Sequence, residues 1–240
     1  MLNNDVLTKA AAGFKSNAKK RFDEALAALL SLAWEYKYLA GDFRFDADPE
    51  LYAEALKICR EMSDGCMADA QAIIQSLFEE EDEIDNASAD EALKSFDMAG
   101  SHMISLLDLW IALAFKSGFT KSYTSITIVR FLNDPYSSGL FGRANLEALK
   151  WGSGYSKNIV TQLAVIGQNL IIDAARMREW REETENGAMY YIRRRGSGFI
   201  CPECDELCGY PIPIDVPFVR LHSRCVCFPE YFYEPIPSEE

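Results

Sequence analysis

Five of the seven cysteines lie between residues 201 and 227, and this clustering constrains the fold more than any other feature of the sequence. Cys201 and Cys204 are separated by two residues. His222 and Cys225 repeat that spacing further along the chain, and Cys227 follows directly. A small secreted protein would use such cysteines in disulfides, whereas the same clustering in an intracellular protein is typical of metal binding.

Structural zinc sites take four tetrahedral ligands from Cys and His, and a C-x-x-C pair can present two thiolates to one ion. We therefore predict a structural Zn²⁺ site, at about one ion per chain. Its predicted ligands are Cys201, Cys204, His222 and Cys225. Cys227 is the alternative fourth ligand, because residues two apart in a strand point to the same face. Cys208 is a further thiol, and the competing interpretation is a set of free thiols in a small β-region.

The chain is acidic, with a formal net charge of -13. Such a chain repels nucleic-acid phosphate unless basic residues gather on one face, and the only dense basic cluster is the arginine run at 193–195. We expect no strong non-specific nucleic-acid binding, while docking on a basic protein stays open. The sequence starts with no secretory signal, and the apolar segment at 103–115 is too short to span a bilayer, so we expect an intracellular chain that does not bind membranes.

Apolar residues at helical spacing predict long helices over most of the sequence. The predicted helices cover residues 5–39, 50–78, 90–116 and 156–183. Gly41 is a plausible stop for the first helix, and Pro49 lies near the start of the second. The first three should form an antiparallel bundle. The acidic run at 79–83 should be solvated.

Residues 117–154 are less regular than the segments around them. Residues 125–129 could form a short strand or one helical turn, and residues 133–139 read as a turn-rich loop. We expect the Gly-Ser-Gly sequence at 152–154 to break the chain before the helix at 156–183.

The character of the sequence changes after Gly187. We predict a strand at 188–192, a hairpin turn at 196–198, an extended proline-rich loop at 211–217 and a closing strand at 225–233. The predicted fold class is therefore α+β, mostly α: long helices followed by a small C-terminal β-rich, zinc-knuckle-like module.

The sequence shows no catalytic constellation, and we expect no enzymatic activity. It has two histidines, and His102 has no partner residue near it in the sequence. A zinc deaminase would pair its ligand histidine with glutamate in an H-x-E arrangement, whereas Ser223 and Arg224 follow His222. Cys59 and Cys66 lie on one helical face, and we interpret them as small buried apolar residues.

The C-terminal third resembles the phage Mu F-like minor head protein family, which takes part in phage head morphogenesis. That family has a long helix, strands, a C-x-x-C pair, a loop and a terminal H-P-x-C-R-C. The corresponding features are the helix at 156–183, the strand at 188–192, Cys201-Pro-Glu-Cys204 and His222-Ser-Arg-Cys225-Val-Cys227. Ser223 replaces the proline that follows the histidine in the family motif, and Val226 replaces the arginine between its two cysteines. The resemblance covers roughly residues 145–233.

The resemblance implies a virion component of a tailed phage or prophage, present in the host cytoplasm during assembly. Proteins of this family associate with the portal or the capsid interior and assist head assembly or DNA delivery. Portal or capsid proteins are therefore the expected partners. The chain could also form an oligomer in the virion. The implied organisation is an N-terminal helical region at 1–120 and a head-morphogenesis module at 121–240. The alternative is a zinc-ribbon-type protein- or nucleic-acid-binding module of a non-virion protein.

Overall fold

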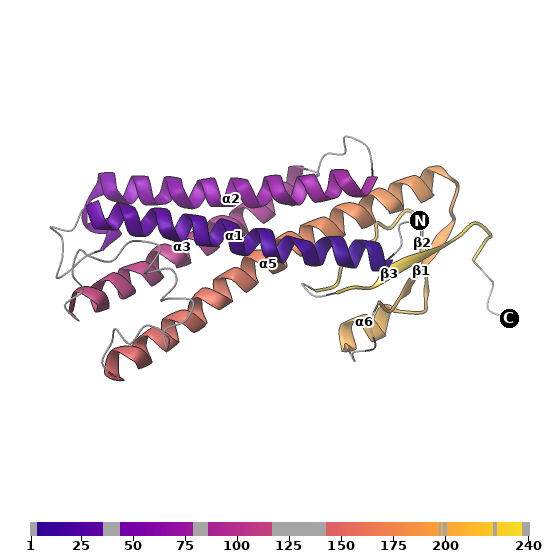
Figure 1. The fold of residues 1–240 in the computed structure, drawn as a ribbon. Coiled ribbons are helices and arrows are strands. Elements are labelled where there is room, and N and C mark those ends of the chain that lie inside the picture. The colour runs from indigo at the N-terminus through magenta and orange to yellow at the C-terminus, as the bar shows by residue number, and fades with distance from the viewer. Residues whose placement is uncertain are drawn as a thin grey trace.

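The structure of the chain is a computed structural model that describes residues 4–35, 44–78, 86–116, 143–196, 198, 201–222 and 225–236. Long helices come first in the chain and a small antiparallel sheet comes last, which confirms the predicted α+β, mostly α fold class (Figure 1). The long helices are α1 (Asn4–Glu35), α2 (Pro49–Phe78), α3 (Asn86–Lys116) and α5 (Arg143–Glu185). A 3-10 turn, η2 (Phe45–Ala47), precedes α2.

The four long helices pack against one another around a single apolar core. Among the side chains that the structure describes, apolar residues recur every three or four positions along these helices and face inward. On α2 the fully or nearly fully buried residues are Leu51, Ala55, Cys59, Met62, Cys66, Ala70 and Ile74. Cys59 and Cys66 are thus buried, as the sequence predicted, whereas Ile58 beside them is only partly buried.

Helix α5 joins the two parts of the molecule. Its middle section, including Ile159, Leu163 and Ile171, is buried in the core with α1, α2 and α3. Near its C-terminal end, Trp180 packs instead against the second, smaller cluster of buried residues. The bundle core thus draws on both of the ranges 1–120 and 121–240, and the division of the chain at residue 120 stays a prediction.

The expected break at residues 152–154 is wrong, because α5 runs through them as continuous helix from Arg143. Two glycines cost a helix about 1 kcal/mol each relative to alanine. The Ala-Asn-Leu-Glu-Ala-Leu-Lys run at 144–150, on the N-terminal side, consists mostly of strong helix formers and offsets part of that cost. Four other predicted features lie outside the described residues: the stop at Gly41, the acidic run at 79–83, the segment at 125–129 and the loop at 133–139.

Residues 188–236, which we call the C-terminal module, form a three-stranded antiparallel sheet with a short helix. The strands are β1 (Tyr190–Arg194), β2 (Pro211–Pro213) and β3 (Phe228–Phe232), in the order β2-β1-β3, and the helix is α6 (Pro202–Leu207). Tyr191, the second residue of β1, pairs with Ile212 on one side and Tyr231 on the other. The predicted strands at 188–192 and 225–233 are confirmed, each displaced by a few residues at its ends.

Two details of the module differ from the prediction. Part of the expected proline-rich loop is strand β2, which tolerates its prolines because it lies at an edge of the sheet. The expected hairpin at 196–198 does not join adjacent strands directly, because helix α6 lies between β1 and β2 in the chain. The pairing of β1 with β2 therefore encloses the segment that carries the first two cysteines.

The packing of α1 against α5 depends on a glycine, and this gives a first testable prediction. A Cβ added at Gly167 would lie 2.0 Å from Cε1 of Phe14, whose side chain is fully buried. We expect Gly167→Ala to lower the free energy of unfolding by about 1–3 kcal/mol through overpacking. A Cβ at Gly13, by contrast, meets no described atom within 4 Å, so Gly13→Ala should stabilise the protein by roughly 0.5–1 kcal/mol. Urea unfolding of both variants measures these changes in stability. A Gly167→Ala variant as stable as wild type would contradict the close packing of Phe14 against Gly167.

Candidate metal centre

The first cysteine pair is positioned by the start of helix α6. Cys201 is the N-cap residue, in an extended conformation, and Pro202 follows in the first turn, where a proline is tolerated. Cys204 lies one turn into the helix and is buried. Backbone hydrogen bonds from Asp205 N to Cys201 O and from Cys208 N to Cys204 O close this turn. The short helix therefore holds the Cys201 and Cys204 thiols on the same side.

The second half of the cluster comes from the segment before β3. Cys225 N donates a hydrogen bond to His222 O at 3.0 Å. The Nε2 atom of His222 lies 3.2 Å from Sγ of Cys201 and also 3.2 Å from Sγ of Cys204. Sγ of Cys225 lies 3.7 Å from Sγ of Cys204. Three of the four residues predicted as ligands, Cys201, Cys204 and His222, thus converge from two segments of the chain, and Cys225 lies beside Cys204.

The ligand atoms form two overlapping groups of three. One group is Cys201, Cys204 and His222, and the other is Cys204, Cys225 and Cys227, with all ligand atoms in each group within 4.8 Å of one another. The two groups share Cys204. The structure therefore places both candidates for the fourth position, His222 and Cys227, beside the same central thiol.

These distances suit tetrahedral zinc. With Zn–S bonds of about 2.3 Å and Zn–N bonds of about 2.0 Å, neighbouring ligand atoms lie roughly 3.6–3.8 Å apart. The Cys204–Cys225 distance of 3.7 Å matches this edge. The two distances to His222 of 3.2 Å are slightly shorter, so a small outward shift of the imidazole would admit an ion. The Cys/His cluster can thus bind a metal ion.

The cysteines are buried in a setting that favours metal binding over free thiolates. Cys204, Cys225 and Cys227 are each at most 3% exposed. Burial raises the pKa of Cys204 above its usual range and raises the pKa of Cys208 to about 11. For Cys225, burial acts in the same direction, but hydrogen bonds with the backbone of Leu221 and Cys227 outweigh it and lower the pKa. A bound metal ion stabilises the thiolate form of its ligands, so it would offset the cost of burying these groups.

Arg193 is a buried cation close enough to the Cys208 thiol to act on it electrostatically. Its side chain is buried, with 2% exposed, and its Nη2 donates to Val219 O at 2.7 Å. The guanidinium lies over the ring of Phe218, 4.2 Å from the centroid, while Nε and Nη1 have no hydrogen-bond partner among the described residues. A buried cation is costly without a compensating charge. Arg193 lowers the pKa of the nearby Cys208 thiol electrostatically, and a zinc–thiolate cluster with net negative charge would compensate it.

Arg193 therefore provides a second prediction. We expect Arg193→Met, which keeps a long side chain but removes the charge, to weaken zinc binding by about 10-fold or more, as is typical of groups that support metal ligands. Competition with a chromophoric chelator measures the affinity. Arg194→Met is the matched control, because Arg194 is exposed and pairs with Glu230 on β3. Equal zinc affinities in the two variants would contradict the proposed charge compensation.

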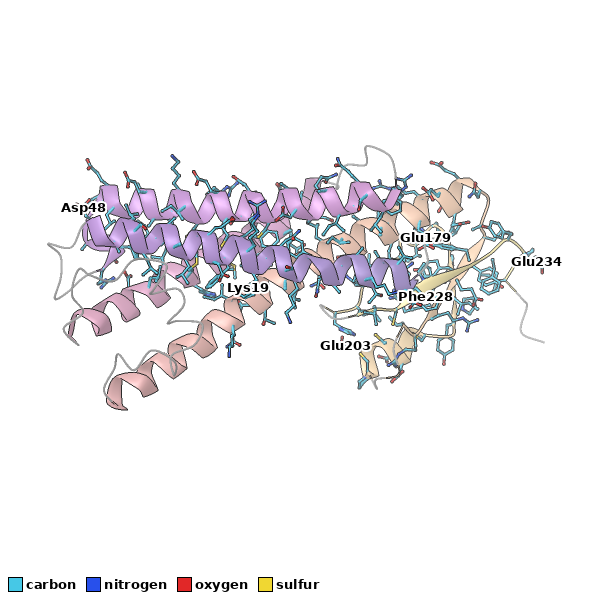
Figure 2. All side chains as sticks on the ribbon, viewed as in Figure 1. Lys19, Asp48, Glu179, Glu203, Phe228 and Glu234 are labelled. Atoms are coloured by element: carbon cyan, nitrogen blue, oxygen red, sulfur yellow. The ribbon has the colours of Figure 1, made fainter. Side chains whose placement is uncertain are left out.

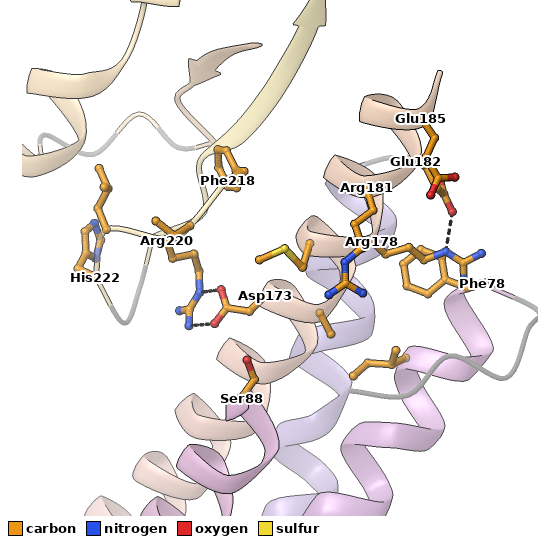
Figure 3. Close-up of a pocket in the computed structure, with 15 residues that line it drawn as sticks. Phe78, Ser88, Asp173, Arg178, Arg181, Glu182, Glu185, Phe218, Arg220 and His222 are labelled. Atoms are coloured by element: carbon orange, nitrogen blue, oxygen red, sulfur yellow. Dashed lines mark hydrogen bonds and ion pairs between the residues drawn. The ribbon is translucent and has the colours of Figure 1, made fainter. Parts of the chain in front are cut away.

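The segment that carries His222 is also tied to the bundle. Arg220 makes a two-pronged ion pair with Asp173 on α5, which Figure 3 shows beside His222. Trp180 Nε1 donates to Ile214 O at 2.9 Å and makes a second link. A cavity of about 490 Å³ lies between α5 and residues 218–222, with His222 in its wall. The ligand segment is thus held from the α5 side as well as within the module.

Other chemically capable residues do not join the cluster. Cys59 and Cys66 are buried in the helical core, as predicted, and burial raises the pKa of each thiol to about 12. His102 lies exposed on α3. Figure 2 shows side chains along the long helices and on the C-terminal module, where Glu203, Phe228 and Glu234 are labelled. Sequence reasoning missed Arg193, since its burial depends on the packing of β1 against residues 218–219.

Within the described residues, no helix combines the length and the apolar character that crossing a membrane requires. Comparisons of the chain with known protein families, with characterised proteins and with solved structures give no match.

Proposed function

We propose that the cysteine–histidine cluster holds structural zinc that fixes the C-terminal module to the end of the helical bundle. The observation that carries this proposal is the position of His222, whose Nε2 lies 3.2 Å from the thiols of both Cys201 and Cys204. Three zinc-ligand atoms from two distant segments converge at this point, and Cys225 offers a fourth beside Cys204. The buried guanidinium of Arg193 supplies a positive charge near the Cys208 thiol of the same module.

The proposed role of the metal is structural. A catalytic zinc takes three protein ligands and keeps a position for water, whereas structural sites are closed by four Cys or His ligands. This cluster offers at least four such ligands, most of them buried. We therefore propose a non-enzymatic protein whose module presents a surface for assembly.

The proposed biological role is that of a phage or prophage minor head protein, associated with the portal or the capsid interior. Support comes from the order of features: a long helix that ends at Glu185, strand β1, the Cys201–Cys204 pair, and the His222, Cys225 and Cys227 motif before the last strand. This is the order of the Mu F-like motif. A helical body with a terminal module cross-linked by zinc suits a protein that must dock on a larger assembly.

The metal and the virion role need separate tests. Elemental analysis of protein purified without chelator should find tightly bound zinc, and a fully folded, metal-free protein with free thiols at Cys201 and Cys204 would defeat the structural site. For the virion role, particles would be purified from a strain that carries the gene on an induced phage, and their proteins identified by mass spectrometry. We expect a low-copy head component. A chain found only outside the particles, in complex with a regulatory protein or nucleic acid, would favour the zinc-ribbon alternative.

A further inference from the structure

The second of the two ligand groups consists of thiols alone. Cys204, Cys225 and Cys227 place their Sγ atoms within 4.8 Å of one another, and Sγ of Cys204 lies 3.7 Å from Sγ of Cys225. The first group differs because it includes the imidazole of His222. The cluster therefore offers two sets of donor atoms with different chemistry, which meet at the Cys204 thiol.

The all-thiol group has three ligands and no fourth. Among the residues that the structure describes, no further Cys, His, Asp or Glu brings a ligand atom within the same distance of all three thiols. Each of the three cysteines is at most 3% exposed, so water has little access to the space between them. Zinc takes four ligands and would have to draw on the first group or on water. The group therefore suits a soft ion that three thiolates satisfy.

Monovalent copper is an ion of this kind, because it prefers soft thiolate ligands and is satisfied by fewer of them than zinc. We propose that Cys204, Cys225 and Cys227 bind one Cu⁺ ion through their three thiolates. Binding releases the three thiol protons. It involves no change of oxidation state, since the copper is supplied already reduced.

Copper and zinc should exclude each other at this cluster. Cys204 belongs to both groups, and the proposed zinc site also takes Cys225 as its fourth ligand. Once Cu⁺ holds these two thiolates, only Cys201 and His222 remain for zinc, and two ligands do not make a structural site. This competition rests on the proposed zinc site, whereas copper binding by the three thiols does not.

Titration of the zinc-loaded full chain with Cu⁺ tests the proposal. The ion would be supplied without oxygen as its complex with the chromophoric chelator bicinchoninate, and both metals retained by the protein would then be measured by elemental analysis. We expect one tightly bound copper ion per chain and loss of the zinc.

The other results of this titration separate the two sites. Zinc retained without copper would overturn the copper proposal and leave the zinc site standing. Copper and zinc retained together would overturn the shared ligands and with them the proposed assignment. Copper bound by a chain that holds no zinc at any stage would overturn the zinc site and support the copper site.

X-ray absorption of the copper-loaded wild type identifies the ligands without any variant. We expect sulfur neighbours only, and a nitrogen neighbour from His222 would overturn the all-thiolate site. Cys227→Ala should weaken Cu⁺ binding by about 100-fold or more, because loss of a ligand costs more than loss of a group that supports one. His222→Ala should leave the copper affinity unchanged, as should Cys66→Ala, which removes a thiol from the bundle core. A Cys227→Ala protein with wild-type copper affinity would overturn the assignment.

Discussion

Replacing Cys201 and Cys204 together by serine is expected to disorder the C-terminal module and to leave most of the helical circular dichroism intact. The module has its own small cluster of buried residues, in which Cys204, Cys225 and Cys227 take the place of larger apolar side chains. So small a core offsets little of its conformational entropy. Structural zinc contributes about 10 kcal/mol or more to the folding of small peptides, so its loss should exceed what the module can withstand.

The helices should withstand the same change, because their core is separate and much larger. Limited proteolysis of the double variant should cut within residues 196–236 and spare α1, α2 and α3. Cys66→Ala serves as the control for loss of a thiol outside the cluster. Global loss of helix would show that the module is integral to the bundle, and a protected module would show that these cysteines hold nothing together.

The converse change, Phe14→Ala, should weaken the bundle and spare the metal. Phe14 is fully buried on α1, where it contacts Gly167 of α5 and lies 6.4 Å from the ring of Phe96 on α3. Truncating such a side chain costs about 3–5 kcal/mol, because it loses apolar burial and leaves a cavity between three helices.

Chemical denaturation followed by helical circular dichroism measures this loss of stability. The zinc content of the folded variant shows whether the metal site is spared. We expect lower stability at unchanged metal content. The matched control is Val6→Ala on the same helix, since Val6 is largely exposed and should change stability little. A Phe14→Ala protein that releases zinc under native conditions would show that the two cores are strongly coupled.

Much of the helical part could be predicted from the sequence because its signal is local. Leu51, Ala55, Met62 and Cys66 recur at helical spacing, and all are buried on α2. The start of α5 could not be predicted in the same way. Glycines at 152 and 154 suggest a break, but their cost is only about 1 kcal/mol each, and the strong helix formers at 144–150 offset part of it.

The metal cluster, too, could be predicted only in part from the sequence. Spacing alone identified the cysteines and His222, because a knuckle pair must lie close in sequence to reach one ion. Spacing could not show that Cys204 lies at the centre of two groups, since this depends on how α6 packs beside residues 222–227. The positive charge of Arg193 was visible only as part of an arginine run. Its burial comes from β1, which turns Arg193 inward and Arg194 outward.

Hydrogen–deuterium exchange of the wild-type protein, before and after zinc is removed with a chelator, tests most directly whether metal holds the module in place. We expect amides of β1 and β3 to lose their protection once elemental analysis confirms that zinc has been removed, and to regain it when ZnCl₂ is restored. Amides in the middle of α1, α2 and α5 should keep their protection throughout, since their core contains none of the ligands. Unchanged protection of β1 and β3 in verified metal-free protein would show that metal does not hold the module in place.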